Sequence, residues 1–309
     1  MEEIISDMFD MQGAILLLLA AGYFFGRQEI LSRKTCADLT QLMLKLILPC
    51  NIFLSFLSNI GRSALLQYAE ILFAAAVLQI ILSVASRFAF QRAEQAKKAC
   101  LQYGLLCSNA TFIGLPIIEA VYGSAGVACA SIAVLPMRIV MWTDGYFLFH
   151  KRTKSPDEKN EIWKKALLNP CMAAVAAGLL AMAANAALPG FLYSGLSYVS
   201  RCTSGMAMLI IGGILSRIDL KSVLDRELFF YCFGRLILIP AAVLALGRLC
   251  RLPSDELGIL VLMQAMPMAT TGVMLAQQCG ANSEYAGGMM CLSTICSAIT
   301  IPAILTLLI

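Results

Sequence analysis

The chain has 309 residues, of which 60% are hydrophobic and only 14% are charged, and its net charge is +4. Because soluble domains carry about 25% charged residues, this composition excludes a soluble enzyme and indicates an integral membrane protein with several spans. The single histidine, His150, and twelve cysteines without a CxxC pair argue against histidine catalysis and metal sites. We therefore expect no enzymatic activity, no metal and no cofactor.

Ten apolar segments, each of roughly 17–25 residues, predict membrane-spanning helices. A polar stretch at 150–165, "HKRTKSPDEKNEIWKK", separates the first five from the last five. The expected fold is an all-α polytopic membrane protein, with a first repeat at 1–150, a linker at 151–165 and a second repeat at 166–309. The ten predicted spans are 8–26, 37–59, 66–86, 98–121, 126–149, 166–187, 199–216, 228–247, 256–278 and 286–308.

Basic residues gather in alternate loops between the predicted spans, including the central loop. The other loops and the termini hold only Arg62, Arg248 and Arg251. Since lysine and arginine are enriched on the cytoplasmic side, the pattern predicts a cytoplasmic central loop at 150–165 and both termini outside.

Five spans in each half mean that the halves enter the membrane in opposite senses, which is the arithmetic of an inverted repeat. The fourth span contains "SNATFIGLP" and the ninth contains "PMATTGVM", both polar and helix-breaking in mid-span. An interrupted helix must be buried in protein or face a water-filled cavity. Paired interruptions are typical of a transporter's binding site. The alternative is that both are kinks without a binding role.

If the two interrupted helices cross, two half-helix N-termini meet near the midplane, one beginning near Pro116 and the other near Thr270 and Thr271. Each brings unpaired N–H groups and about half a positive charge. Such a place favours an anion, most simply a carboxylate. The polar candidates for substrate binding in these stretches are Ser108, Asn109, Thr111, Thr270 and Thr271.

Four charged residues within the spans have two interpretations each. Arg138 in span 5 neutralises an anionic substrate or forms a structural pair, since intramembrane arginine needs a cavity or a partner. Arg235 in span 8 has the same two alternatives. Glu119 and Asp144 are candidate proton carriers for coupling, or else interfacial or paired carboxylates.

Several motifs occur in a specific order along nearly the whole chain: "LILPCNIF", "SNATFIGLPIIEAVYG", "SGMAMLIIGGIL", "GRLILIP" and "MQAMPMATTGVMLAQQCG". In this the chain resembles the auxin efflux carrier family of bacterial permeases and plant PIN-formed auxin carriers. The resemblance implies ten helices with helices 4 and 9 crossed, and a homodimer. It also implies a scaffold of spans 1, 2, 6 and 7 and a transport domain of spans 3–5 and 8–10 that moves like an elevator.

The family motif around the breaks corresponds to Asn109, Gly114, Pro116 and Pro267. Span 5 departs from the family, because "LPMRIVMW" carries an arginine where the plant carriers have uncharged residues. The resemblance therefore does not identify the substrate, and auxin in particular is not inferred from it.

The expected function is secondary active or facilitative transport of a small organic anion across the cell inner membrane, with H⁺ or Na⁺ as candidate coupling ions. The alternative is a membrane receptor that binds a small ligand without moving it. The basic loops are expected to face anionic lipid headgroups, and no nucleic acid partner is expected.

Overall fold

The computed structural model describes residues 2–57, 67–149, 169–184, 186–217 and 225–308. Helices are the only regular elements in these ranges, apart from one isolated antiparallel bridge between Ser108 and Met268. The all-α prediction is therefore confirmed for the described residues. The predicted linker at 151–165 lies outside them.

In the first half of the chain, helices lie over the described parts of the first five predicted spans. In chain order they are α1 (Glu2–Arg27), α2 (Arg33–Leu42), η1 (Met43–Ile47), α3 (Leu48–Leu57), α5 (Ala69–Phe88), α6 (Gln95–Leu106), η2 (Ala110–Gly114), α7 (Leu115–Ala133), α8 (Leu135–Trp142) and α9 (Asp144–Phe149). The three η elements found in the described ranges are π-helical turns.

The second half continues with helices over the last five predicted spans. They are α11 (Pro170–Ala183), α12 (Gly190–Leu215), α14 (Arg226–Phe233), η3 (Gly234–Leu238), α15 (Ile239–Leu249), α16 (Ser254–Ala265), α17 (Thr271–Gln278) and α18 (Ser283–Leu308).

Six helical runs in the described residues are long and apolar enough to cross a membrane. They are Arg33–Leu57, Ala69–Phe88, Ala110–Phe149, Gly190–Leu215, Arg226–Leu249 and Ser283–Leu308, and shorter apolar helices cover Gln12–Arg27 and Pro170–Ala183. A polytopic membrane protein agrees with these lengths. The ten-span inverted repeat stays a prediction.

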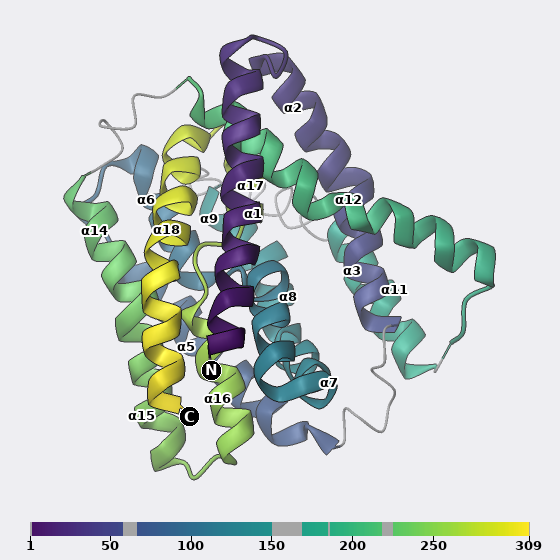
Figure 1. Ribbon diagram of the computed structural model, residues 1–309, viewed down its shortest axis with the longest axis vertical. Coiled ribbons are helices and arrows are strands. Elements are labelled where there is room, and N and C mark those ends of the chain that lie inside the picture. Colours follow the sequence, from purple (N-terminus) through teal and green to yellow (C-terminus); the bar gives the residue numbers. More distant parts are fainter. Residues whose placement is uncertain (1, 58–66, 150–168, 185, 218–224, 309) are drawn as a thin grey trace, which may run out of the picture.

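The helices pack around the broken segments. α1 lies along α12, and α3 packs on α11 and α12. In Figure 1, α2, α3 and α11 lie on the right, and α1 runs down the middle. Helices α14, α15 and α18 lie on the other side, and contacts of α18 with α12 and of α17 with α2 join the two sides. The start of α1 and the end of α18 lie at the same end of the molecule.

Each π-helical turn ends two residues before a proline: Pro49 after η1, Pro116 after η2 and Pro240 after η3. Proline lacks an N–H, and its ring collides with the preceding turn of an α-helix. The wider turn accommodates it without ending the helix. The expectation that a half-helix begins near Pro116 is therefore wrong: the helix begins at Ala110, and Pro116 lies within its continuation.

Close packing of α1 on α12 depends on glycines that face each other. A Cβ on Gly22 would overlap the carbonyl oxygen of Leu209, and a Cβ on Gly212 would overlap that of Leu19. Small residues let helix backbones approach closely, which is how helices associate in lipid without a hydrophobic drive.

We expect Gly212→Ala to destabilise the protein, because the new methyl group meets backbone and forces the two helices apart. The cost is about 1–3 kcal/mol, the usual range for overpacking. A lower thermal unfolding midpoint of the purified protein checks this. The matched control is Gly195→Ala in the same helix, where a Cβ meets nothing within 4 Å; equal midpoints for both variants would contradict the proposed contact.

Candidate functional site

The two interrupted helices cross and hydrogen-bond to each other through their extended breaks. The Asn109 N–H donates to the Pro267 carbonyl at 2.8 Å, and the Ala269 N–H donates to the Cys107 carbonyl at 3.2 Å. This short antiparallel pairing joins the break between α6 and η2 to the break between α16 and α17. Each break thus satisfies part of the backbone of the other.

Arg235 donates hydrogen bonds to the carboxyl ends of α6 and α16, the two helices that precede the breaks. Its Nη1 donates to the Leu105 carbonyl at 3.0 Å, and its Nε donates to the Met266 carbonyl at 3.2 Å. Its Nη2 donates to Oε1 of Gln264 at 3.1 Å. A helix carboxyl end carries about half a negative charge and unpaired carbonyls. This fully buried arginine therefore caps α6 and α16 together.

Two neutral side chains complete this capping. Gln79 on α5 donates from Nε2 to the Leu106 carbonyl at 3.0 Å. Ser108 donates from Oγ to the Met263 carbonyl at 2.8 Å. The carbonyls freed by the two breaks thus find donors inside the protein, as the bilayer interior requires.

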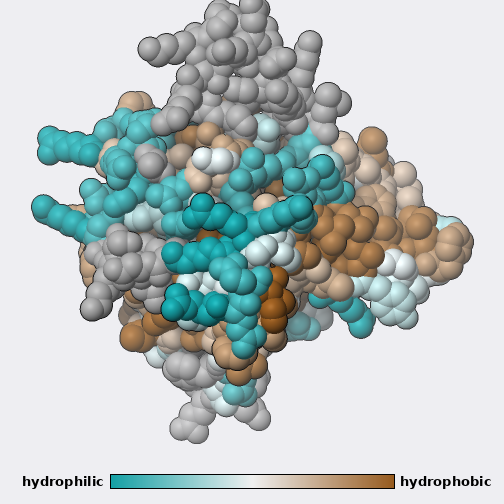
Figure 2. Space-filling model, turned by 90° about the horizontal axis from the view of Figure 1, so that it is seen from above, coloured by the Kyte–Doolittle hydropathy of each residue, from teal (hydrophilic) through white to brown (hydrophobic). Residues whose placement is uncertain are grey.

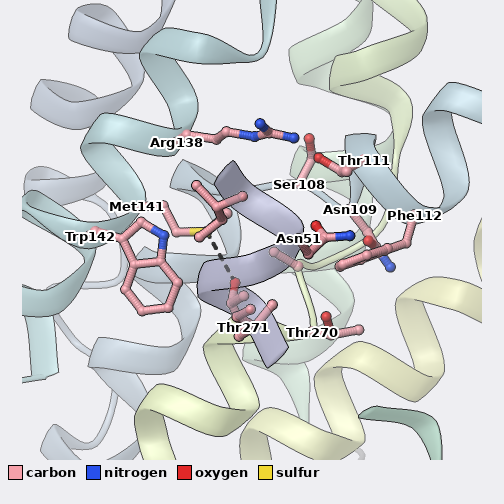
Figure 3. A pocket seen from close by; sticks show the side chains of 13 residues that line it. Asn51, Ser108, Asn109, Thr111, Phe112, Arg138, Met141, Trp142, Thr270 and Thr271 are labelled. Atoms are coloured by element: carbon pink, nitrogen blue, oxygen red, sulfur yellow. Dashed lines mark hydrogen bonds between the residues drawn. The ribbon is translucent and has the colours of Figure 1, made fainter. Parts of the chain in front are cut away.

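A small cavity lies at the other side of the breaks, where η2 and α17, the helices that follow the breaks, begin. Its volume is about 40 Å³, room for roughly three water molecules or a carboxylate group. Thr111 and Phe112 in the first turn of η2, and Thr270 and Thr271 at the start of α17, border it. First-turn N–H groups have no intrahelical acceptor and carry partial positive charge. Figure 3 shows the residues that surround the cavity.

Arg138 on α8 brings a full positive charge to the cavity wall. Only 6% of its surface is exposed, its Nη1 donates to Oγ of Ser55, and its guanidinium lies 5.7 Å from the centre of the Phe56 ring. Across the part of the chain that the structure describes, it forms no ion pair with a carboxylate. A buried charge without a counter-ion is costly, so an anion in the cavity would be stabilised.

Asn109 adds an unpaired donor to the same cavity. It is 2% exposed, and its Nδ2 has no hydrogen-bond partner among the described residues. Leaving a buried donor unsatisfied costs about 1–3 kcal/mol. Asn109 thus lines the same cavity as Arg138 and carries a buried donor without a partner among the described residues.

The structure gathers half of the twelve site residues expected from the sequence around the cavity. Pro267 contributes its backbone to the crossing, and Gly114 and Pro116 lie outside the cavity, where a Cβ on Gly114 would come within 3.2 Å of Met266. The six that line the cavity are Ser108, Asn109, Thr111, Arg138, Thr270 and Thr271.

The remaining charged candidates lie away from the cavity. Asp144 accepts hydrogen bonds from Oγ of Ser83 and from Nη2 of Arg87, the latter at 3.0 and 3.1 Å. Glu119 is exposed on α7. Asp144 is thus a paired carboxylate between α5 and α9.

Sequence reasoning missed the wall that α3 provides. Asn51 lines the cavity and donates from Nδ2 to Oγ of Ser200 on α12 at 2.9 Å. The asparagine directly after "LILPC" was the available signal, since polar residues within spans mark functional positions. Met141 and Trp142 on α8 also line the cavity, but they carry no signal that separates them from core residues.

A polytopic helical chain whose broken helices cross beside a polar cavity has the architecture of a membrane transporter. Residues 13–305 match the family model described as "Membrane transport protein". The chain belongs to this family, and the resemblance to the auxin efflux carrier family is confirmed.

Curated relatives of this chain are transporters by name. "Uncharacterized transporter YfdV" of Escherichia coli (strain K12) is 23% identical over 300 residues, 93% of each chain. "Uncharacterized transporter MJ1031" of Methanocaldococcus jannaschii is 22% identical over 267 residues, 84% of this chain and 86% of the relative. An "Uncharacterized transporter" of Methanothermobacter thermautotrophicus is 22% identical over 94% of each chain.

We expect Arg235→Lys to destabilise the protein by roughly 3 kcal/mol, although it keeps the charge. A lysine ammonium cannot span three acceptors that a guanidinium fork reaches, and each lost hydrogen bond to a charged group is worth about 1.5–3 kcal/mol. Thermal unfolding in detergent measures the effect. Arg248→Lys, at an exposed position on α15, is the control; if both variants melt together, the capping role is refuted.

Proposed function

We propose that this protein is a secondary active or facilitative transporter of a small organic anion, with a carboxylate held in the crossover cavity. Its family supports membrane transport. The choice of an anion depends on one observation: Arg138 and Asn109 are buried donors at one cavity, and neither has an anionic partner within the described residues.

Charge dominates the expected binding energy. A carboxylate about 4 Å from the Arg138 guanidinium gains about 4 kcal/mol at an effective dielectric constant near 20. Each helix N-terminus adds about 0.3–1 kcal/mol, and the Asn109 amide adds about 1.5–3 kcal/mol. A neutral ligand of the same size would gain only the smaller contributions, which favours an anionic substrate.

The lining of the cavity fits an elevator-type mechanism. Leu48, Asn51 and Ile52 on α3 form one wall, whereas the crossover and α8 form the rest. In the predicted division α3 belongs to the scaffold, and the crossover and α8 belong to the transport domain. Movement of that domain past α3 would carry a bound anion across the membrane. We also propose a homodimer through the scaffold helices, as the family resemblance implies.

Uptake into proteoliposomes tests the function directly. Monocarboxylates and dicarboxylates are screened with and without a sodium gradient and a pH gradient, which also separates H⁺ coupling, Na⁺ coupling and uncoupled flux. Saturable uptake of at least one anion supports transport. Saturable binding without flux in the same vesicles would favour the receptor alternative, and neither binding nor flux in folded protein would refute the anion proposal.

We expect the affinity order wild type, Asn109→Ala, Asn109→Asp. Alanine removes one hydrogen bond to a charged group, about 1.5–3 kcal/mol. Aspartate places a like charge about 4 Å from the substrate, a cost on the order of 4 kcal/mol and about a thousandfold in affinity. Equilibrium binding to detergent-purified protein measures the order. Equal affinity of the two variants would mean that no anion is held at this position.

We expect Arg138→Gln to weaken binding of the anion by roughly two to three orders of magnitude, because it removes the principal counter-charge. Arg138→Lys should retain part of the affinity, since it keeps the charge. Binding is compared with Arg201→Gln, an exposed position on α12 outside the cavity. Arg138→Gln protein that is folded and binds like the Arg201→Gln control would contradict the assigned role.

The proposed orientation has the central loop in the cytoplasm and both termini outside. Single cysteines at Ser155, at Glu3 and after Ile309 are introduced into a background without the exposed Cys202 and Cys250. A membrane-impermeant maleimide should label the two terminal cysteines in intact cells and Ser155→Cys only after lysis. Labelling of the termini from opposite sides would mean an odd number of spans and would contradict the inverted repeat.

A further inference from the structure

A second, larger cavity opens at the end of the molecule opposite the two chain ends. Its volume is about 490 Å³, within the usual range of small-molecule pockets. The beginning of α2, the end of α12 and the connection between α17 and α18 line it. Hydrophilic side chains gather on this face in Figure 2, which is the face that the sequence predicts to be cytoplasmic.

The lining of this cleft is positively charged. Arg33, Lys34 and Arg217 line the cleft with one carboxylate, Glu284, and Arg217 also forms an ion pair at 3.8 Å with Glu29, which lies outside the lining. Arg33 donates to Glu284 at 3.0 Å, yet 80% of its side chain stays exposed. Among the described residues, Lys34 has no ion-pair partner. Three cations against two carboxylates leave an excess of one positive charge at the cleft.

Two helix N-termini add to this charge without being sites by themselves. The amino ends of α2 and α18 border the cleft, and each carries about half a positive charge. Both are already capped: Oγ of Ser32 accepts from the Thr35 N–H, and Oδ1 of Asn282 accepts from the Tyr285 N–H. These helix ends contribute a positive electrostatic potential rather than free hydrogen-bond donors, and the side chains supply the direct contacts.

We propose that this cleft binds a phosphate-bearing anion, from a soluble phosphate ester or from the headgroup of an anionic phospholipid. Lys34, which has no ion-pair partner among the described residues, and the exposed Arg33 are placed to contact this anion. Arginine and lysine are the side chains that bind phosphate. Basic pockets between transmembrane helices on the cytoplasmic side recognise such headgroups. The binding site is distinct from the crossover cavity, because the two have no lining residue in common.

The position of the cleft gives the bound anion a regulatory effect. Arg33 and Lys34 lie on α2 and Arg217 follows the end of α12, both helices of the predicted scaffold, whereas Glu284 lies on α18 of the predicted transport domain. Across the same seam, Oγ1 of Thr40 donates to Oε1 of Gln277 at 2.6 Å. An anion that competes with Glu284 for Arg33 releases the ion pair between the two groups of helices. This consequence depends on the proposed transport function; the binding itself does not.

Binding is measured on the full-length protein with two kinds of probe. In neutral detergent, inorganic phosphate and glycerol phosphate are titrated, and the rise in thermal unfolding midpoint gives the affinity. In nanodiscs of phosphatidylcholine, phosphatidic acid is added and its retention is measured by native mass spectrometry. Retained phosphatidic acid identifies a headgroup as the ligand, and saturable stabilisation by the soluble esters identifies a soluble ligand; either result supports the site.

Three charge variants test whether individual charges of the cleft raise or lower the affinity for the anion. Lys34→Gln should weaken binding about fivefold, the equivalent of about 1 kcal/mol for one basic residue near an anionic group. Glu284→Gln should strengthen binding by a similar factor, because it removes the competing carboxylate. Arg92→Gln, an exposed basic position outside the cleft, should leave binding unchanged, and so should Asn109→Ala at the crossover.

Three results would overturn the proposal. They are no saturable binding of any probe, Lys34→Gln and Glu284→Gln proteins that bind like wild type, and an Arg92→Gln effect as large as that of Lys34→Gln. The last would mean diffuse attraction to a basic face. Since no transport is measured, a failed uptake screen leaves this result intact, and loss of binding here leaves the transport proposal intact.

Discussion

Backbone that is broken inside a membrane must find its hydrogen bonds within the protein, because lipid offers none. The crossing of the two breaks meets this requirement. Asn109 and Ala269 donate their backbone amides across the crossing, and side chains of Arg235, Gln79 and Ser108 bind the carbonyls that remain. The helices around the crossing must pack where they do, because they supply these donors.

In this arrangement the carboxyl ends and the amino ends of the half-helices have different surroundings. Their carboxyl ends, with partial negative charge, are bound by one buried guanidinium, that of Arg235. Their amino ends, with partial positive charge, are left beside the cavity that Arg138 also borders. Capping one set of ends while leaving the other free produces a local field that favours anions. In the proposed anion site the backbone therefore adds a smaller contribution to the one that the Arg138 side chain makes.

The sequence predicted the paired breaks because proline, glycine and polar residues occur at corresponding mid-span positions in the two halves. It placed the start of the half-helix at Pro116, since proline favours a first turn, and could not foresee the π-helical turn that begins at Ala110. It could not choose between cavity and carbonyls for Arg235, because both satisfy a buried guanidinium. The pairing of Asp144 with Arg87 likewise depends on how α9 packs on α5.

The short antiparallel pairing at the crossing also limits how the chain can vary in length. Side chains alternate between two faces along extended backbone, so a shift of one residue exchanges the faces. A single insertion between Cys107 and Asn109 would turn the asparagine away from the cavity and leave the Pro267 carbonyl without its donor. Substitutions in these two segments act on one contact at a time, whereas an insertion or deletion would change all of them together. Length is therefore the most strictly constrained property of the crossing.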